Sequence, residues 1–122
     1  MSSKTQIVDE VLRRRAQECF ACEDALHVDD DERQHRFRLA CKRLRFAIEL
    51  FEIPELAQTA EALSQITDEL GASHDCAVLA KRARKCDAGR VAVRALAERP
   101  PAIARAAAIW RRIKPQVQER IR

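Results

Sequence analysis

Residues 35–51 read HRFRLACKRLRFAIELF, a stretch that combines a regular apolar pattern with a high density of positive charge. On a helical projection of about 100° per residue, its main apolar side chains fall within an arc of about 80°. These side chains are Phe37, Cys41, Leu44, Ile48 and Phe51. The pattern predicts an amphipathic α-helix that packs one face into a hydrophobic core.

Basic residues of the same stretch occupy a second arc of about 80°, beside the apolar one. We call them the basic row: His35, Arg38, Lys42 and Arg45. Like charges one turn apart repel each other, and only Glu49 shares this arc as a counter-charge. The row therefore predicts an anionic partner. Pattern alone leaves three candidates open: acids on neighbouring helices (such as Glu61, Asp68, Glu69 and Asp75), a nucleic acid, or a polyphosphate.

Length and composition predict one small helical domain, spanning residues 1–122. The chain is 47% hydrophobic, with only two Gly and four Pro, and its commonest residues are good helix formers. No run approaches the roughly 18 apolar residues of a spanning helix, and the N-terminal residues lack the apolar stretch of a signal peptide. We therefore expect a soluble cytoplasmic protein with no membrane partner.

Hydrophobic periodicity predicts four helical regions and no strands. The first three cover about residues 5–26, 31–52 and 54–85, with the acidic stretch 29–32 opening the second and Pro54 opening the third. The fourth covers 87–98 and 102–114, interrupted at Pro100 and Pro101 and ended by Pro115. Residues 87–98 could instead form a short separate helix. The expected fold is an all-α, antiparallel four-helix bundle.

Charge is distributed unevenly along the chain. Residues 1–80 carry 10 Lys and Arg against 16 Asp and Glu, whereas residues 81–122 carry 13 against 3. This asymmetry indicates either a basic surface for a polyanionic partner or an ordinary solvated helix face.

The chain contains five cysteines, an odd number that does not suggest a disulfide framework. Cys19 and Cys22 form a C-x-x-C pair without a second pair to complete a zinc site. We expect both as small apolar residues on the buried side of a helix, and we expect no metal and no cofactor.

Two motifs resemble those of a known family. The stretch 35–51 fits H-x-x-R-x-x-x-K-R-L-R-F-A-x-E-L-F, the signature helix of the CHAD domain (conserved histidine α-helical domain). LGASHDCAVLA at 70–80 resembles the family's L-G-x-x-x-D-x-x-V segment, and AAAIWRRIKP at 106–115 resembles its closing basic helix. The resemblance extends over about residues 5–115.

The resemblance implies an all-α protein that binds inorganic polyphosphate through a basic groove, in some cases at polyphosphate granules. By motif matching, the anion-binding positions are the basic row and Arg43, although the helical projection places Arg43 on another side. Further candidates are Lys81 on the third helix and the pair Arg105 and Arg112 on the last, which could form a second wall. Asp75 would orient basic side chains through charge-assisted hydrogen bonds, whereas Trp110 is expected in the core.

Family members usually contain two such repeats, whereas this chain has room for one, most similar to the second. The chain could be a fragment, a minimal relative, or a half that rebuilds the pair as a homodimer.

Three other functions compete with non-enzymatic polyphosphate binding. RNA binding is less favoured, because few aromatic residues are present to stack on bases. A hydrolase using His35 or Asp75 lacks an acidic cluster for paired metals and a P-loop. The third alternative is a protein-interaction bundle whose basic row pairs with acidic partners.

Overall fold

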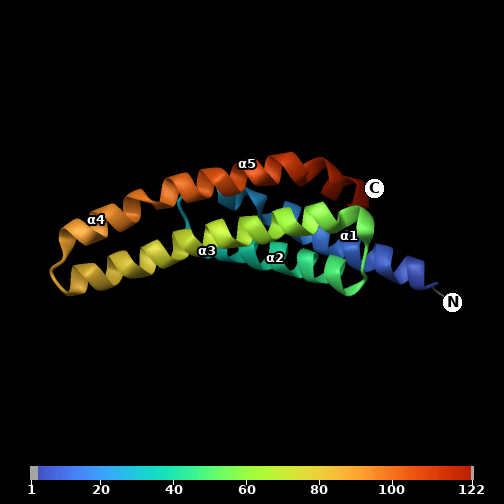
Figure 1. The fold of residues 1–122 in the computed structure, drawn as a ribbon, viewed down its shortest axis with the longest axis horizontal. Helices are drawn as coiled ribbons and strands as arrows, with labels where there is room; N and C mark the ends of the chain where they lie inside the picture. The colour runs from blue at the N-terminus through green and yellow to red at the C-terminus, as the bar shows by residue number, and fades with distance from the viewer. Residues whose placement is uncertain (1–2, 122) are drawn as a thin grey trace.

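The computed structural model describes residues 3–121, which form helices joined by short turns (Figure 1). The α-helices are α1 (Lys4–Cys22), α2 (Asp31–Leu50), α3 (Ala57–Lys85), α4 (Gly89–Ala97) and α5 (Arg99–Gln118). Three short 3₁₀ turns lie between or after them: η1 (Glu23–His27), η2 (Pro54–Leu56) and η3 (Glu119–Ile121). No strand occurs in this part of the chain.

Helices α1, α2, α3 and α5 form an antiparallel bundle around one core, which confirms the predicted fold class (Figure 1). Helix α4 is separate from α5 and packs on the C-terminal part of α3. The alternative in which residues 87–98 form their own short helix is therefore the correct one.

Local capping explains where the first two bundle helices begin. Ser3 and Gln6 form a capping box, in which the Ser3 hydroxyl accepts from the Gln6 backbone N–H at 3.1 Å. Asp30 caps α2 by accepting from the Arg33 backbone N–H, also at 3.1 Å. The predicted opening of the second helix at the acidic stretch is confirmed.

Two predicted helix ends need correction. The first helix ends at Cys22 rather than 26, because the chain tightens into η1, where the Glu23 carboxylate is held by Trp110 and Lys114. The second ends at Leu50, since Glu52 turns the chain with a left-handed φ of 49°. The third α-helix correspondingly starts at 57, after η2.

The predictions made from the C-terminal prolines were wrong. Pro100 and Pro101 lie in the first turn of α5, where no backbone N–H donor is needed, so only Glu98 separates α4 from α5. Pro115 lies inside α5 and does not end it. The turn after Pro115 buries Val117 in the core, and this packing compensates for the hydrogen bond that an exposed proline near the helix end removes.

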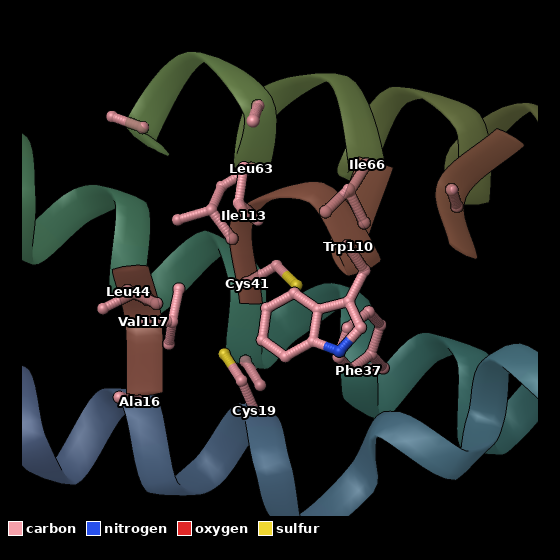
Figure 2. Close-up of a cluster of buried hydrophobic side chains, with 14 of the residues drawn as sticks. Ala16, Cys19, Phe37, Cys41, Leu44, Leu63, Ile66, Trp110, Ile113 and Val117 are labelled. Carbon is pink, nitrogen blue, oxygen red and sulfur yellow. The ribbon is translucent and has the colours of Figure 1, made fainter. Parts of the chain in front are cut away.

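Trp110 lies in the bundle core, as predicted for this residue. Figure 2 shows Trp110 beside Phe37, with Cys19 and Cys41 reaching into the same cluster from α1 and α2. The Trp110 ring packs edge-on against Phe37, with centroids 5.2 Å apart, and lies 5.5 Å from the ring of Phe20. The apolar stripe of α2 is buried as predicted, except that Phe51 is half-buried.

Beyond His74, α3 leaves the bundle and pairs with α4 as a two-helix hairpin, which extends to the left in Figure 1. We call residues 75–97 the arm. Its inner face is a separate small cluster built mainly of alanine: Ala80, Ala83, Ala92 and Ala95, with Cys76, Ala88 and Leu96 packed against them. The start of α2 and the start of α5 both lie level with residues 73–74, which marks the base of the arm.

Candidate anion-binding site

The basic row lies along the side of α2 that borders α3. Two of its members reach across to α3: Arg38 contacts Thr67 and Arg45 contacts Ser64. His35 is exposed, and the other three residues are half-buried. The predicted row is therefore a continuous structural feature at the α2–α3 seam.

Arg38 is held at this seam by backbone atoms rather than by an acid. Its Nε donates to the Thr67 carbonyl oxygen at 3.1 Å. The guanidinium covers Gly71, where an added Cβ would come within 3.0 Å of Nη2 and 3.3 Å of Cζ. Gly71 thus provides the space in which the Arg38 side chain lies.

Arg45 is held one step further along the seam. Its Nη1 donates to the Ser64 hydroxyl at 3.2 Å, and its Nε lies 4.0 Å from Glu49 on the same helix. The Nε atom is buried and makes no hydrogen bond. Arg45 therefore keeps unused donor capacity.

His35 and Lys42 are the open members of the row. Within residues 3–121, neither forms a hydrogen bond or an ion pair. Anchored and open basic residues consequently alternate along α2, over about 15 Å at 1.5 Å per residue.

Acids on neighbouring helices do not neutralise the row. Of the four acids considered, only Glu69 forms an ion pair in the described part of the chain, and its partner is Arg105 on α5, with Nε to Oε2 at 2.6 Å. The interpretation in which Glu61, Asp68, Glu69 or Asp75 compensates the row is therefore wrong.

Arg43 points to the other flank of α2, as its helical position predicts, yet it is not remote from the row. It lines a surface pocket of about 490 Å³ together with Lys42 and Arg45. The exposed Phe46 and Leu50 contribute to the same pocket. Arg43 thus lines the same pocket as two members of the row.

The remaining candidate cations are not gathered at the row. Lys81 lies exposed on the arm and has no partner among the described residues. Arg105 is compensated by Glu69, and Arg112 lines a pocket that also contains Glu55 and Glu61. A second wall formed by Arg105 and Arg112 stays a prediction.

Asp75 is exposed and contacts no cation in the part of the chain that the structure describes, so its orienting role also stays a prediction. Asp31 holds basic side chains instead. Its Oδ2 lies 3.0 Å from His74 Nδ1, and its Oδ1 lies 3.4 Å from Arg99 Nη2.

Arg99 is a structural residue that the sequence did not point out. Its side chain is 12% exposed and also contacts the Ser73 hydroxyl at 3.2 Å, the Gln34 side-chain oxygen at 3.3 Å and Asp29 at 3.5 Å. It joins the starts of α2 and α5 to α3 at the base of the arm. The acidic stretch 29–32 was the signal in the sequence that could have indicated a basic partner. Its role in opening the second helix already accounted for these acids, so a distant arginine was not expected.

Cys19 and Cys22 pack in or against the bundle core, as expected for the C-x-x-C pair. Cys19 and Cys41 are fully buried. Cys22 is half-buried, and its thiol donates to the Glu18 carbonyl oxygen at 3.1 Å. Burial, reinforced by the neighbouring Cys19 and acids, raises the pKa of Cys22 to about 11; burial likewise raises the pKa of Cys41.

Residues 3–121 contain no group of three or more His, Cys, Asp or Glu side chains that could hold a metal ion. None of their helices has the length and apolar character that crossing a membrane requires.

Comparison with known proteins agrees with the motifs. Residues 2–84 match the family model of the CHAD domain, a match that includes α1, α2 and nearly all of α3. The match covers more than half of the chain, and the protein therefore belongs to the CHAD family. No curated protein and no solved structure matches the chain.

Proposed function

We propose that this protein binds inorganic polyphosphate without catalysing a reaction, and that the basic row on α2 is the binding surface. Cytoplasmic polyphosphate, including that of granules, would be its ligand. The observation that carries the proposal is that the row has no acidic partner on neighbouring helices. Membership of the CHAD family supports the choice of polyanion.

The arrangement of the row suits a linear chain of phosphates. Arg38 and Arg45 are positioned by the Thr67 carbonyl and the Ser64 hydroxyl, which are neutral acceptors. The one acid near them is Glu49 of α2, 4.0 Å from Arg45, among the described residues. Lys42 lies between the two arginines, and His35 lies at one end of the row. Neither Lys42 nor His35 forms a hydrogen bond or ion pair in the described chain. Successive phosphates could therefore contact successive turns of one helix.

The test is to substitute Lys42→Ala together with Arg38→Ala and measure retention on polyphosphate at several salt concentrations. Losing two phosphate contacts should weaken binding at low salt and reduce the slope of log K against log salt by about 1.4, as for a single-stranded polyanion. Lys42→Ala alone should give about half that change without removing a hydrogen bond or ion pair of the described chain.

The matched control is Lys4→Ala together with Arg111→Ala, which removes two exposed charges outside the row. It should bind almost as the wild type does. Equal retention of the row variant and the control would refute the assignment of the row, provided that circular dichroism shows both proteins helical.

Two additional measurements separate the alternatives. Polyphosphate should outcompete single-stranded RNA, because the row contains no Phe, Tyr or Trp side chain on which bases could stack. Incubation with Mg²⁺ or Mn²⁺ should release no phosphate. A preference for RNA, or metal-dependent phosphate release, would contradict the proposal.

A further inference from the structure

The arm carries a concentration of positive charge that the bundle does not compensate. Six cations on it are exposed, and none forms a hydrogen bond or an ion pair within the described chain: Lys81, Arg82, Arg84, Lys85, Arg90 and Arg94. Only two acids, Asp75 and Asp87, accompany them. The arm therefore presents a net positive surface that extends away from the bundle (Figure 1).

Exposed aliphatic side chains are interleaved with these cations. Their exposed fractions are 37% for Val78, 50% for Leu79, 46% for Val91 and 69% for Val93. Each has a cation three residues away on its own helix, hence about one turn away, as in the pairs Leu79 with Arg82 and Val91 with Arg94. Each exposed aliphatic side chain therefore has a basic neighbour on the outer surface of the arm.

The inner face of the arm does not require these aliphatic residues. Its buried contacts are made mainly by alanines, so the larger Val and Leu side chains stand outside the cluster. Burying them against a partner would remove apolar surface from water, which is favourable. The partner of this surface should accordingly be both anionic and able to receive aliphatic groups.

Among anionic partners, these properties favour a lipid surface. The arm contains no Phe, Trp or Tyr, so it lacks the stacking platforms with which proteins hold single-stranded nucleic acids. A bare phosphate polymer would use the cations and leave the aliphatic residues in water. Anionic membranes provide headgroup phosphates for Lys and Arg and an acyl boundary for Val and Leu.

We propose that the arm docks on membranes rich in anionic phospholipids, lying on the surface with its cations at the headgroups. This inference revises the sequence-based expectation of no membrane partner. It does not depend on polyphosphate binding, because the row and the arm are separate sets of residues on different parts of the molecule.

The experiment is co-sedimentation of the full chain with vesicles of phosphatidylglycerol and phosphatidylcholine in equal amounts, and with vesicles of phosphatidylcholine alone. Binding is expected only to the anionic vesicles. Arg82→Gln with Arg94→Gln should lower the partition coefficient about 25-fold at low salt, from about fivefold for each cation near the lipid surface. Leu79→Ser with Val91→Ser should lower it about tenfold through lost apolar burial.

Matched controls remove equivalent groups from the bundle. Arg111→Gln with Lys4→Gln removes two exposed charges, and Ile7→Ser removes an aliphatic side chain that is 49% exposed, close to the exposure of Leu79. Both should bind vesicles nearly as the wild type does. All substituted positions are exposed, and circular dichroism will verify that the variants are folded.

Three results would overturn the inference: no binding to anionic vesicles, arm variants that bind as well as the controls, or loss of binding by the charge variant alone. Loss of binding by the charge variant alone would mean that the arm binds vesicles through its charge, without burying its aliphatic side chains. In parallel, the arm variants are tested for RNA binding; if they lose RNA binding while vesicle binding is unchanged, the arm is a nucleic-acid surface instead.

Discussion

At the scale of single residues, the basic row contains two kinds of cation. Arg38 and Arg45 are already immobilised by neutral acceptors on α3, whereas His35 and Lys42 form no hydrogen bond or ion pair in the described chain. Immobilising a long side chain on binding costs about 0.5–1.5 kcal/mol. The anchored arginines avoid much of this penalty, so they should contribute orientation, while the open residues contribute adaptable contacts.

Cys22 is the residue from which a pH dependence of stability can be predicted. Its folded-state pKa of about 11 exceeds the ordinary value of 9.0, so folding favours the protonated thiol. This contribution is complete below pH 9 and is lost as the pH rises to about 11. The free energy of unfolding of the wild type, relative to Cys22→Ala, should therefore decrease across this window in urea titrations. A pH-independent difference between the two proteins would contradict the prediction.

At the scale of elements, α3 contributes to both the bundle and the arm. Its N-terminal part packs in the core, and its C-terminal part pairs with α4. Gly71 lies close to the transition and lets the Arg38 side chain approach the helix backbone. This explains why a residue that weakens helices is placed in the interior of the longest helix of the described chain.

Gly71→Ala should separate stability from binding. Alanine favours the helix by about 1 kcal/mol, and the steric conflict involves only the flexible end of Arg38. We expect an equal or higher melting temperature but an affinity for polyphosphate lower by about fivefold, equivalent to about 1 kcal/mol. Thermal denaturation and fluorescence titration measure the two effects.

Gly89→Ala is the matched control for this substitution, since a Cβ at that position meets no atom within 4 Å. It should leave polyphosphate affinity unchanged. If Gly71→Ala also leaves affinity unchanged, the position of Arg38 over Gly71 is not needed for binding.

At the scale of the whole molecule, the excess of basic residues in the C-terminal part of the sequence divides into two groups, cations that pair with acids and cations that do not. Several cations of α5 and η3 pair with acids from the first half of the chain: Arg99 with Asp29 and Asp31, Arg105 with Glu69, Lys114 with Glu23, and Arg120 with Asp9. The cations of the arm have no such pairs within residues 3–121. Among the cations of residues 81–121, folding therefore leaves most of those without an acidic partner on the arm.

The predicted homodimer is also a property of the whole molecule. Phe46 and Leu50 are 64% and 63% exposed on α2, beside the pocket that includes Arg43, and a second copy could cover them. With polyphosphate present, we expect a mass of about twice the 13.9 kDa of the chain. Light scattering should show this, and Phe46→Ser should shift the population toward monomer. A monomer under all conditions would exclude the dimer.

Much of the fold and part of the site could be predicted because they depend on local pattern. The two stripes of α2, the cap before Asp31 and the buried Trp110 all follow from spacing and side-chain chemistry. The helix through Pro115 could not be predicted, because its stability depends on the packing of Val117 against distant residues. The pairing of Arg105 with Glu69 likewise joins helices far apart in sequence.

By itself, the sequence determined the all-α class, the apolar face of α2 and the family to which the protein belongs, since helical periodicity and motifs are read over short distances. Only the tertiary structure decided which cations are neutralised. Whether Arg38 meets an acid or a backbone carbonyl depends on how α2 and α3 are aligned, and whether the arm is covered depends on where the bundle ends. Both are set by contacts between residues far apart in the chain, and for that reason the charges of Arg38 and Lys42 in HRFRLACKRLRFAIELF could be seen to lack an acidic partner only after folding.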